Sequence, residues 1–146
     1  MGLKRLLQDL VGLRPTRMQV AALCLRGEGA VREVLLVTSR GTGRWILPKG
    51  WPIPGRDLAG SALQEAWEEA GVQGKASKRP VGRYADIKHN AQGLGLPVRV
   101  LVFQVDDVRL ADDFPEKGQR ERRWVALGEA ADLVNDGGLA DLLRGL

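Results

Sequence analysis

Short runs of Val, Leu and Ala, separated by turn-forming residues, dominate the hydrophobic pattern along this chain. Residues 17–26 and 33–39 are two such runs, and the GEGA connection near them predicts two adjacent strands joined by a turn. Residues 98–105 place valines at every second position, which is the period of a strand. Further strands are predicted at residues 45–47, 80–87 and 121–126, with loops at residues 75–79 and 88–97.

The helical period of about 3.6 residues is clearest in residues 58–70. The side that faces the core is formed by Leu63, Ala66, Trp67 and Ala70, and three glutamates fall on nearly the opposite side. Asp57 is predicted to cap the N-terminus, because its side-chain oxygen can accept from a free amide of the first turn. Gly71 is predicted to end the helix in the left-handed conformation. One face of this helix is therefore core, and the other is a carboxylate surface.

Three shorter segments also have helical patterns. Leucines at positions 3, 6, 7 and 10 predict an amphipathic helix over residues 1–13, which packs on the domain or contacts a partner. Residues 130–134 and 139–143 predict two short helices around a break at residues 135–138. Strands on both sides of a central helix, with helices at the ends, predict an α/β fold in which helices cover both faces of a mixed sheet.

Composition narrows the class of protein. The 146 residues suffice for a single domain, residues 1–146, and 44% hydrophobic with 27% charged residues is typical of a globular protein. The formal net charge of +4 favours acidic partners without separating a nucleotide from an inositol phosphate or RNA. No apolar run approaches the roughly 20 residues of a membrane span, and we expect neither a signal peptide nor membrane binding.

Cysteine and histidine occur once each, as Cys24 and His89. An internal disulfide is therefore excluded, and Cys24 lies in an apolar run where a buried, inert thiol is expected. A reducing, cytoplasmic location fits this composition. One histidine cannot build a zinc site with several histidine ligands. The chemistry is thus expected to rest on carboxylates.

Glu65, Glu68 and Glu69 are the carboxylates that the central helix brings together, at positions i, i+3 and i+4. Like charges at this spacing destabilise a helix by about 0.2–0.5 kcal/mol per pair. Two interpretations are open: a solvated acidic face, or a site for Mg²⁺ or Mn²⁺, which prefer carboxylate oxygens and leave positions for water and phosphate. The Gly/Pro-rich loop LPKGWPIPG, which leads from a strand straight into the helix, favours the cation site.

The segment 50–72, GWPIPGRDLAGSALQEAWEEAGV, resembles the box of the Nudix hydrolases, G-x5-E-x7-R-E-U-x-E-E-x-G-U with U aliphatic. The matching positions are Gly50, Glu65, Ala66, Glu68, Glu69, Gly71 and Val72. Arg56 and Gln64 depart from the first glutamate and the arginine of the pattern, which in the family help to tie the loop to the helix. We expect other contacts to hold the loop here and activity to survive.

The resemblance implies a Nudix-type α/β/α sandwich and a pyrophosphohydrolase that depends on Mg²⁺ or Mn²⁺. Glu65 and Glu69 are expected to bind the metal together with the backbone carbonyl of Lys49. Glu68 is expected to be the base or a further metal ligand, although the roles within the three glutamates are interchangeable on sequence. The acidic residues between positions 106 and 116 either add a ligand or base or form a solvated loop.

Residues 20–51 and 121–134 are similar to a bacterial branch of the family that resembles diphosphoinositol polyphosphate and diadenosine polyphosphate hydrolases. A phosphorylated small molecule is therefore the expected substrate. The residues expected to contact it are Arg17, Ser39, Arg40, Arg44, Lys49 and Gly50. The Lys49 side chain is expected to be free for phosphate, and Trp51 is the tryptophan best placed to stack on a base.

Other functions stay open from the sequence. One is removal of pyrophosphate from RNA 5′ ends, so that nucleic acid enters only as a possible substrate. Another is a regulatory module that binds a phosphate ligand and has lost turnover. Nonspecific nucleic-acid binding is a third, and it predicts retention on RNA that weakens steeply with salt. The chain is expected to be a monomer or a homodimer.

Overall fold

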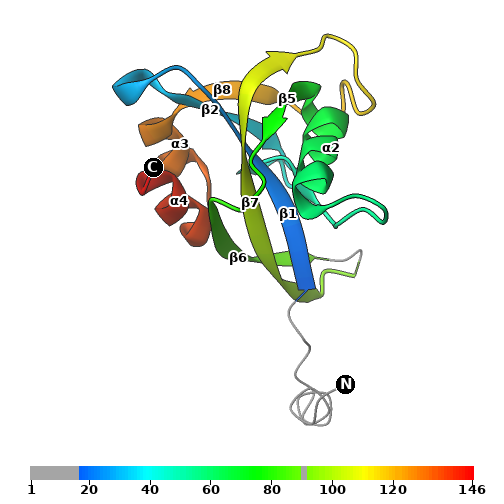
Figure 1. The fold of residues 1–146 in the computed structure, drawn as a ribbon. Coiled ribbons are helices and arrows are strands. Elements are labelled where there is room, and N and C mark those ends of the chain that lie inside the picture. The colour runs from blue at the N-terminus through cyan, green and yellow to red at the C-terminus, as the bar shows by residue number, and fades with distance from the viewer. Residues whose placement is uncertain (1–16, 90–91) are drawn as a thin grey trace.

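The computed structural model describes residues 17–89 and 92–146, which form an eight-stranded mixed sheet and three α-helices (Figure 1). The strands are β1 (Arg17–Arg26), β2 (Glu33–Thr38), β3 (Trp45–Ile46), β4 (Lys49–Gly50), β5 (Val72–Ala76), β6 (Gly82–His89), β7 (Gly95–Leu110) and β8 (Arg122–Ala126). The helices are α2 (Leu58–Ala70), α3 (Leu127–Leu133) and α4 (Gly137–Arg144), with a 3₁₀ turn at Gly29–Val31. The helix predicted over residues 1–13 lies outside the described residues.

β1 is the central strand of the sheet. It runs parallel to β7, from the pair Arg17 and Val98 to the pair Cys24 and Val105, and antiparallel to β2 and β4. β7 also pairs with β5 and β6, and β2 pairs with β3 and β8, all antiparallel. The nearly continuous apolar run of β1 follows from this position, because a strand covered on both faces buries every side chain.

Helices cover both faces of the sheet, as the sequence pattern predicted. α2 packs on one face against β1, β4, β5 and β7, while α3 and α4 pack together on the other (Figure 1). Alternate residues of β1 face the two layers: Leu23 joins the cluster beneath α3 and α4, and Cys24 joins the cluster beneath α2. The fold is therefore a single-domain α/β/α sandwich. None of the helices in the described part of the chain is long and apolar enough to cross a membrane.

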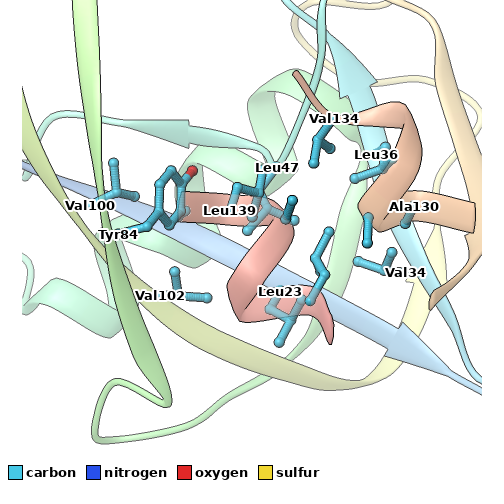
Figure 2. Packing of buried hydrophobic residues seen from close by; sticks show 14 of the residues in the cluster. Leu23, Val34, Leu36, Leu47, Tyr84, Val100, Val102, Ala130, Val134 and Leu139 are labelled. Carbon is cyan, nitrogen blue, oxygen red and sulfur yellow. The ribbon is translucent and has the colours of Figure 1, made fainter. Parts of the chain in front are cut away.

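The larger hydrophobic cluster lies between the sheet and the two C-terminal helices. Leu23, Leu36 and Tyr84 from three strands belong to this cluster together with Leu139 of α4 (Figure 2). On the other side of the sheet Cys24 is fully buried, and burial raises the pKa of its thiol to about 12. The prediction that the thiol is buried is confirmed, and its raised pKa is consistent with an inert thiol.

The predicted central helix coincides with α2. The Asp57 carboxylate accepts the backbone N–H of Gly60 at 2.7 Å, and Gly71 has φ 69°, so both caps are those expected. A side chain at Gly71 would also collide with Phe114 and the carbonyl oxygen of Ala111, so glycine is required there on two grounds.

Two strands were missed from the sequence, and one is longer than predicted. β4 has only two residues, and β5 includes residues 75–76, which were predicted as loop. β5 is polar and interrupted at Gly74 by a shift in register against β7, so its sequence lacks an alternating pattern. β7 extends the predicted 98–105 segment to Gly95–Leu110 and shortens the predicted loop before it.

Candidate active site

α2 lies close to the sheet because the residues on its inner side are small. Ala62, Ala66 and Ala70 are fully buried there, and they let the helix backbone approach β1 and β5. This placement turns Glu65 and Glu69 toward β4 and the loop of residues 111–121. Of the two interpretations, the solvated acidic face is wrong for Glu69, whose residue is only 5% exposed.

Glu69 is held from two sides. The backbone N–H of Lys49 in β4 donates to its Oε2 at 3.0 Å, and Nη2 of Arg120 lies 3.1 Å from its Oε1. Burial raises the pKa of Glu69 to about 7, and the nearby carboxylates of Glu65 and Glu116 add to the rise although Arg120 and the Lys49 amide oppose it. A carboxyl group whose pKa is shifted to about 7 in this way is a candidate functional residue.

Glu65 lies against the backbone of Gly50. A Cβ atom at position 50 would come within 2.6 and 2.7 Å of the two carboxylate oxygens of Glu65, closer than real Cβ contacts. The missing side chain of the glycine therefore allows this close approach of the carboxylate. Burial raises the pKa of Glu65 to about 7, helped by the charges of Glu68 and Glu116 and opposed by Arg120.

Glu68 points to a different partner. Its Oε1 accepts from Nε2 of Gln64 at 3.2 Å, and its main-chain oxygen accepts the N–H of Glu116 at 2.9 Å. Glu68 does not line the cavity described below. Its charge raises the pKa of Glu65, so it lies near the site. Its role as a base stays a prediction.

Arg120 is a site residue that the sequence did not single out, and Glu116 was one of several loop acids considered as an extra ligand or base. Both lie in the loop of residues 111–121 between β7 and β8, and the N–H bond from Glu116 to the main chain of Glu68 fixes this loop on α2. Arg120 lies beside Glu116, with Nε 3.4 Å from Oε1. The acidic character of the loop was noted from the sequence, and the structure places one of its carboxylates in the site.

A cavity of about 610 Å³ opens over these groups. Its acidic end is formed by Glu65, Glu69 and Glu116, with Arg120 between them. Cationic side chains also line it, namely Arg40 and Arg44 from the loop between β2 and β3, and Lys88 from β6. Part of the remaining wall is apolar and is formed by Trp51, Pro52, Ile53, Pro54 and Ile87, and His89 also lines the cavity.

Most of the residues predicted to contact substrate line this cavity, but the side chains of Lys49 and Ser39 are hydrogen-bonded to other protein groups. The Lys49 ammonium was expected to be free; it is instead bound to Oδ2 of Asp86 at 3.0 Å and to Oε1 of Gln19 at 2.9 Å, in an ion pair whose side chains are each 9% exposed. The Ser39 hydroxyl lies 2.6 Å from that of Thr42 and accepts the N–H of Arg44, so it shapes the turn.

Arg17 and Arg40 complete the predicted set. Arg17 begins β1 opposite Val98 and does not line the cavity. Arg40 lines it and donates from Nη1 to Oε1 of Gln119 at 3.1 Å, which leaves its remaining guanidinium donors for a ligand. Their roles toward substrate stay predictions.

The loop before α2 is held without the usual Glu-Arg pair of the box. Oγ of the buried Ser61 accepts the N–H of Ile53 at 2.9 Å, and the N–H of Arg56 donates to the Ile53 carbonyl at 3.1 Å. Gln64, at the arginine position, bonds to Glu68 within the helix. Backbone and hydroxyl contacts therefore hold the loop, as we expected from Arg56 and Gln64 at the positions of the usual pair.

The donor set suits a hard divalent cation. The charge of Glu116 adds to the raised pKa of Glu65 and of Glu69, and a bound cation would relieve this repulsion. In the described residues no three His, Cys, Asp or Glu side chains gather closely enough to enclose an ion. Mg²⁺ does not need such a cage, because one or two carboxylates with water and phosphate oxygens complete its shell. The residues fit the cation on chemical grounds.

Fold and site together define an α/β/α domain with buried carboxylates at one end of a basic, partly apolar cavity, a class suited to phosphorylated ligands. Residues 15–144 match the family model described as the NUDIX domain, so the chain belongs to the Nudix hydrolase family. Nudix hydrolases generally use divalent metal ions.

Named relatives extend this result. The chain is 32% identical over 123 residues to diphosphoinositol polyphosphate phosphohydrolase 3-alpha of Mus musculus, covering 81% of this chain and 69% of the relative. It is 31% identical over 123 residues to the Homo sapiens protein of that name, with the same two shares. Among solved structures it is similar to a C. elegans Ap4A hydrolase, with TM-score 0.62, 22% identity and coverage of 89% and 95%. A MutT protein from Methanosarcina mazei Go1 gives TM-score 0.62 at 24% identity, with coverage of 90% and 93%. These structural likenesses concern the fold.

Proposed function

We propose that this protein hydrolyses phosphoanhydride bonds in X-linked diphosphates, with Mg²⁺ or Mn²⁺ bound at the carboxylates of the cavity. The observation that carries the proposal is the meeting of Glu65 and Glu69 from α2 with Glu116 from a distant loop, at one end of a cavity lined by arginines. Membership of the Nudix hydrolase family supports the reaction type. Arginine favours phosphate because its fixed fork of donors matches two phosphate oxygens at once.

In this proposal Glu65 and Glu69, with the Lys49 carbonyl, hold the cation, and Glu116 is a further candidate ligand. The bound cation would screen phosphate charge and lower the pKa of a water molecule. Water oxygen then bonds to phosphorus, the bridging P–O bond breaks, and the released proton passes to a carboxylate. Glu68 is the proposed base on the strength of its nearness to Glu65.

Two substrate classes are supported, each by a different observation. Relatives about 30% identical are named diphosphoinositol polyphosphate phosphohydrolases, which favours a densely phosphorylated ring. The apolar wall favours a dinucleoside polyphosphate, because Trp51 and Ile87 are 39% and 53% exposed beside the cavity and the apolar face of a base could cover them. A densely phosphorylated ring has no such apolar face.

A substrate panel with Mg²⁺ tests the proposal. Phosphate and nucleotide release would be measured from a diphosphoinositol polyphosphate, diadenosine tetraphosphate and an RNA with a 5′-triphosphate, before and after addition of a chelator. We expect chelator-sensitive turnover of one of the first two. Turnover of RNA alone would replace the substrate assignment, and no turnover of any member above the rate of Glu69→Gln would refute the hydrolase and leave a binding module.

Trp51→Ala separates the two substrate classes. If a base stacks on Trp51, the variant raises KM for the dinucleotide by about tenfold, since stacking contributes about 1–3 kcal/mol per base. Turnover of the inositol compound would stay near that of the parent protein. An equal effect on both substrates would show that Trp51 supports the loop and does not recognise a base.

A further inference from the structure

Arg120 occupies the centre of the acidic end of the cavity. Its side chain is 9% exposed, and its guanidinium makes three contacts: Nη2 with Oε1 of Glu69 at 3.1 Å, Nε with Oε1 of Glu116 at 3.4 Å, and Nη1 with the carbonyl oxygen of Thr38 at 3.1 Å. Two of the three partners are carboxylates of the proposed cation site. The third lies on β2 and anchors the guanidinium to the sheet.

These contacts use the oxygens that a cation would need. Oε1 of Glu69 faces Arg120, and Oε2 accepts the N–H of Lys49. A divalent ion on Glu69 would put two positive charges beside a buried guanidinium, and repulsion between them is strong where water is excluded. The absence of a three-ligand cluster in residues 17–89 and 92–146 agrees with carboxylates arranged around an arginine.

We infer that Arg120 takes the place of the cation in the metal-free protein, and that cation binding and the Arg120–Glu69 contact exclude each other. Arg120 then has two effects: it stabilises the buried carboxylates when no ion is present, and it weakens the binding of the ion. The inference rests on the proposed function, because it takes Glu69 as a ligand. Linked equilibria of this kind change affinity by about 5- to 150-fold.

The test measures Mn²⁺ affinity by calorimetry on the metal-free full-length chain. Arg120→Gln is expected to bind Mn²⁺ at least about fivefold more tightly than the parent protein. It should also melt at a lower temperature in chelator and gain more stability from Mn²⁺. Lys88→Gln is the matched control, because it removes one charge from an exposed lysine of the same cavity that forms no ion pair with the described site carboxylates. Its affinity should change much less.

Unchanged or weaker Mn²⁺ binding by Arg120→Gln would overturn the inference, and so would an equal gain in Lys88→Gln. Arg120→Lys is the second variant, because it keeps the charge and the fold but cannot span all three partners. Its affinity should fall between those of the parent and Arg120→Gln, and an affinity equal to the parent's would count against the inference. Glu69→Gln distinguishes failure of this inference from failure of the proposed function. Unaltered Mn²⁺ binding by this variant would refute the proposed metal site itself.

Discussion

Gly50→Ala tests whether the position of the Glu65 carboxylate decides activity. The added methyl group would lie 2.6 and 2.7 Å from the two carboxylate oxygens, so the carboxylate must move by several tenths of an ångström. The atoms that must yield are the end of a flexible side chain. The folded state should therefore lose only about 1 kcal/mol, at the low end for an overpacked site.

Catalysis should respond far more than stability. A displacement approaching 1 Å in a catalytic group can lower the rate by about 10²-fold, equivalent to about 2.7 kcal/mol of transition-state stabilisation. The assay is kcat/KM with saturating Mg²⁺, beside a thermal melt of the same preparation. Gly128→Ala is the control, because a methyl group there meets nothing within 4 Å.

Two results would refute this reasoning. If Gly50→Ala keeps the kcat/KM of the parent protein, the carboxylate of Glu65 has no fixed place in the reaction. If the variant loses stability and activity together, the glycine is required for folding and the loss of activity says nothing about Glu65. The expected pattern is a large fall in kcat/KM with a melting temperature close to that of Gly128→Ala.

Three further predictions concern stability. Asp86→Asn removes one partner of the buried ion pair with Lys49 and should cost about 3 kcal/mol in urea unfolding, whereas a loss below about 1 kcal/mol would show that Gln19 alone suffices. Because the pKa of Glu69 rises from 4.5 to about 7 on folding, the folded chain binds more protons across that window, so in chelator the unfolding free energy should fall as pH rises from 4.5 to 7. Glu69→Gln should flatten that slope, and an unchanged slope would contradict the cited cause. Arg122→Gln removes hydrogen bonds of 2.7 Å to the carbonyl of Ala70, at the end of α2, and of 2.8 Å to that of Ala111, in the loop after β7. The loss should cost about 1–3 kcal/mol, measured by denaturant midpoint, and an unchanged midpoint would show that water replaces the guanidinium.

Local signals in the sequence were sufficient for the central helix. The cap at Asp57 and the left-handed Gly71 act within a few residues, so α2 could be predicted with both of its ends. The small β4 and the polar β5 could not be predicted, because their strand conformation comes from pairing with β1 and β7, which are distant in sequence. The general layering followed from the pattern because the apolar run of β1 needs cover on both faces.

The site shows the same division between local and distant information. The spacing of Glu65 and Glu69 on one helix was visible in the sequence, but the burial of Glu69 depends on β4 and on Arg120, which is 51 positions away in the chain. Likewise Lys49 is bound by Asp86, 37 residues further on, and no periodic pattern links the two. A family box therefore indicates the candidate ligands, whereas their counter-charges become known only from the fold.

We propose that the carboxylates of α2 and of the loop 111–121 bind a divalent cation beside a polyphosphate. A decisive experiment is anomalous diffraction from a crystal soaked with Mn²⁺ and a nonhydrolysable dinucleoside polyphosphate. We expect an Mn²⁺ peak bound by Glu65 and Glu69, with phosphate oxygens in its shell and Arg120 moved away from Glu69. A peak elsewhere, or bound polyphosphate with no Mn²⁺ at these glutamates, would refute the proposed cation site.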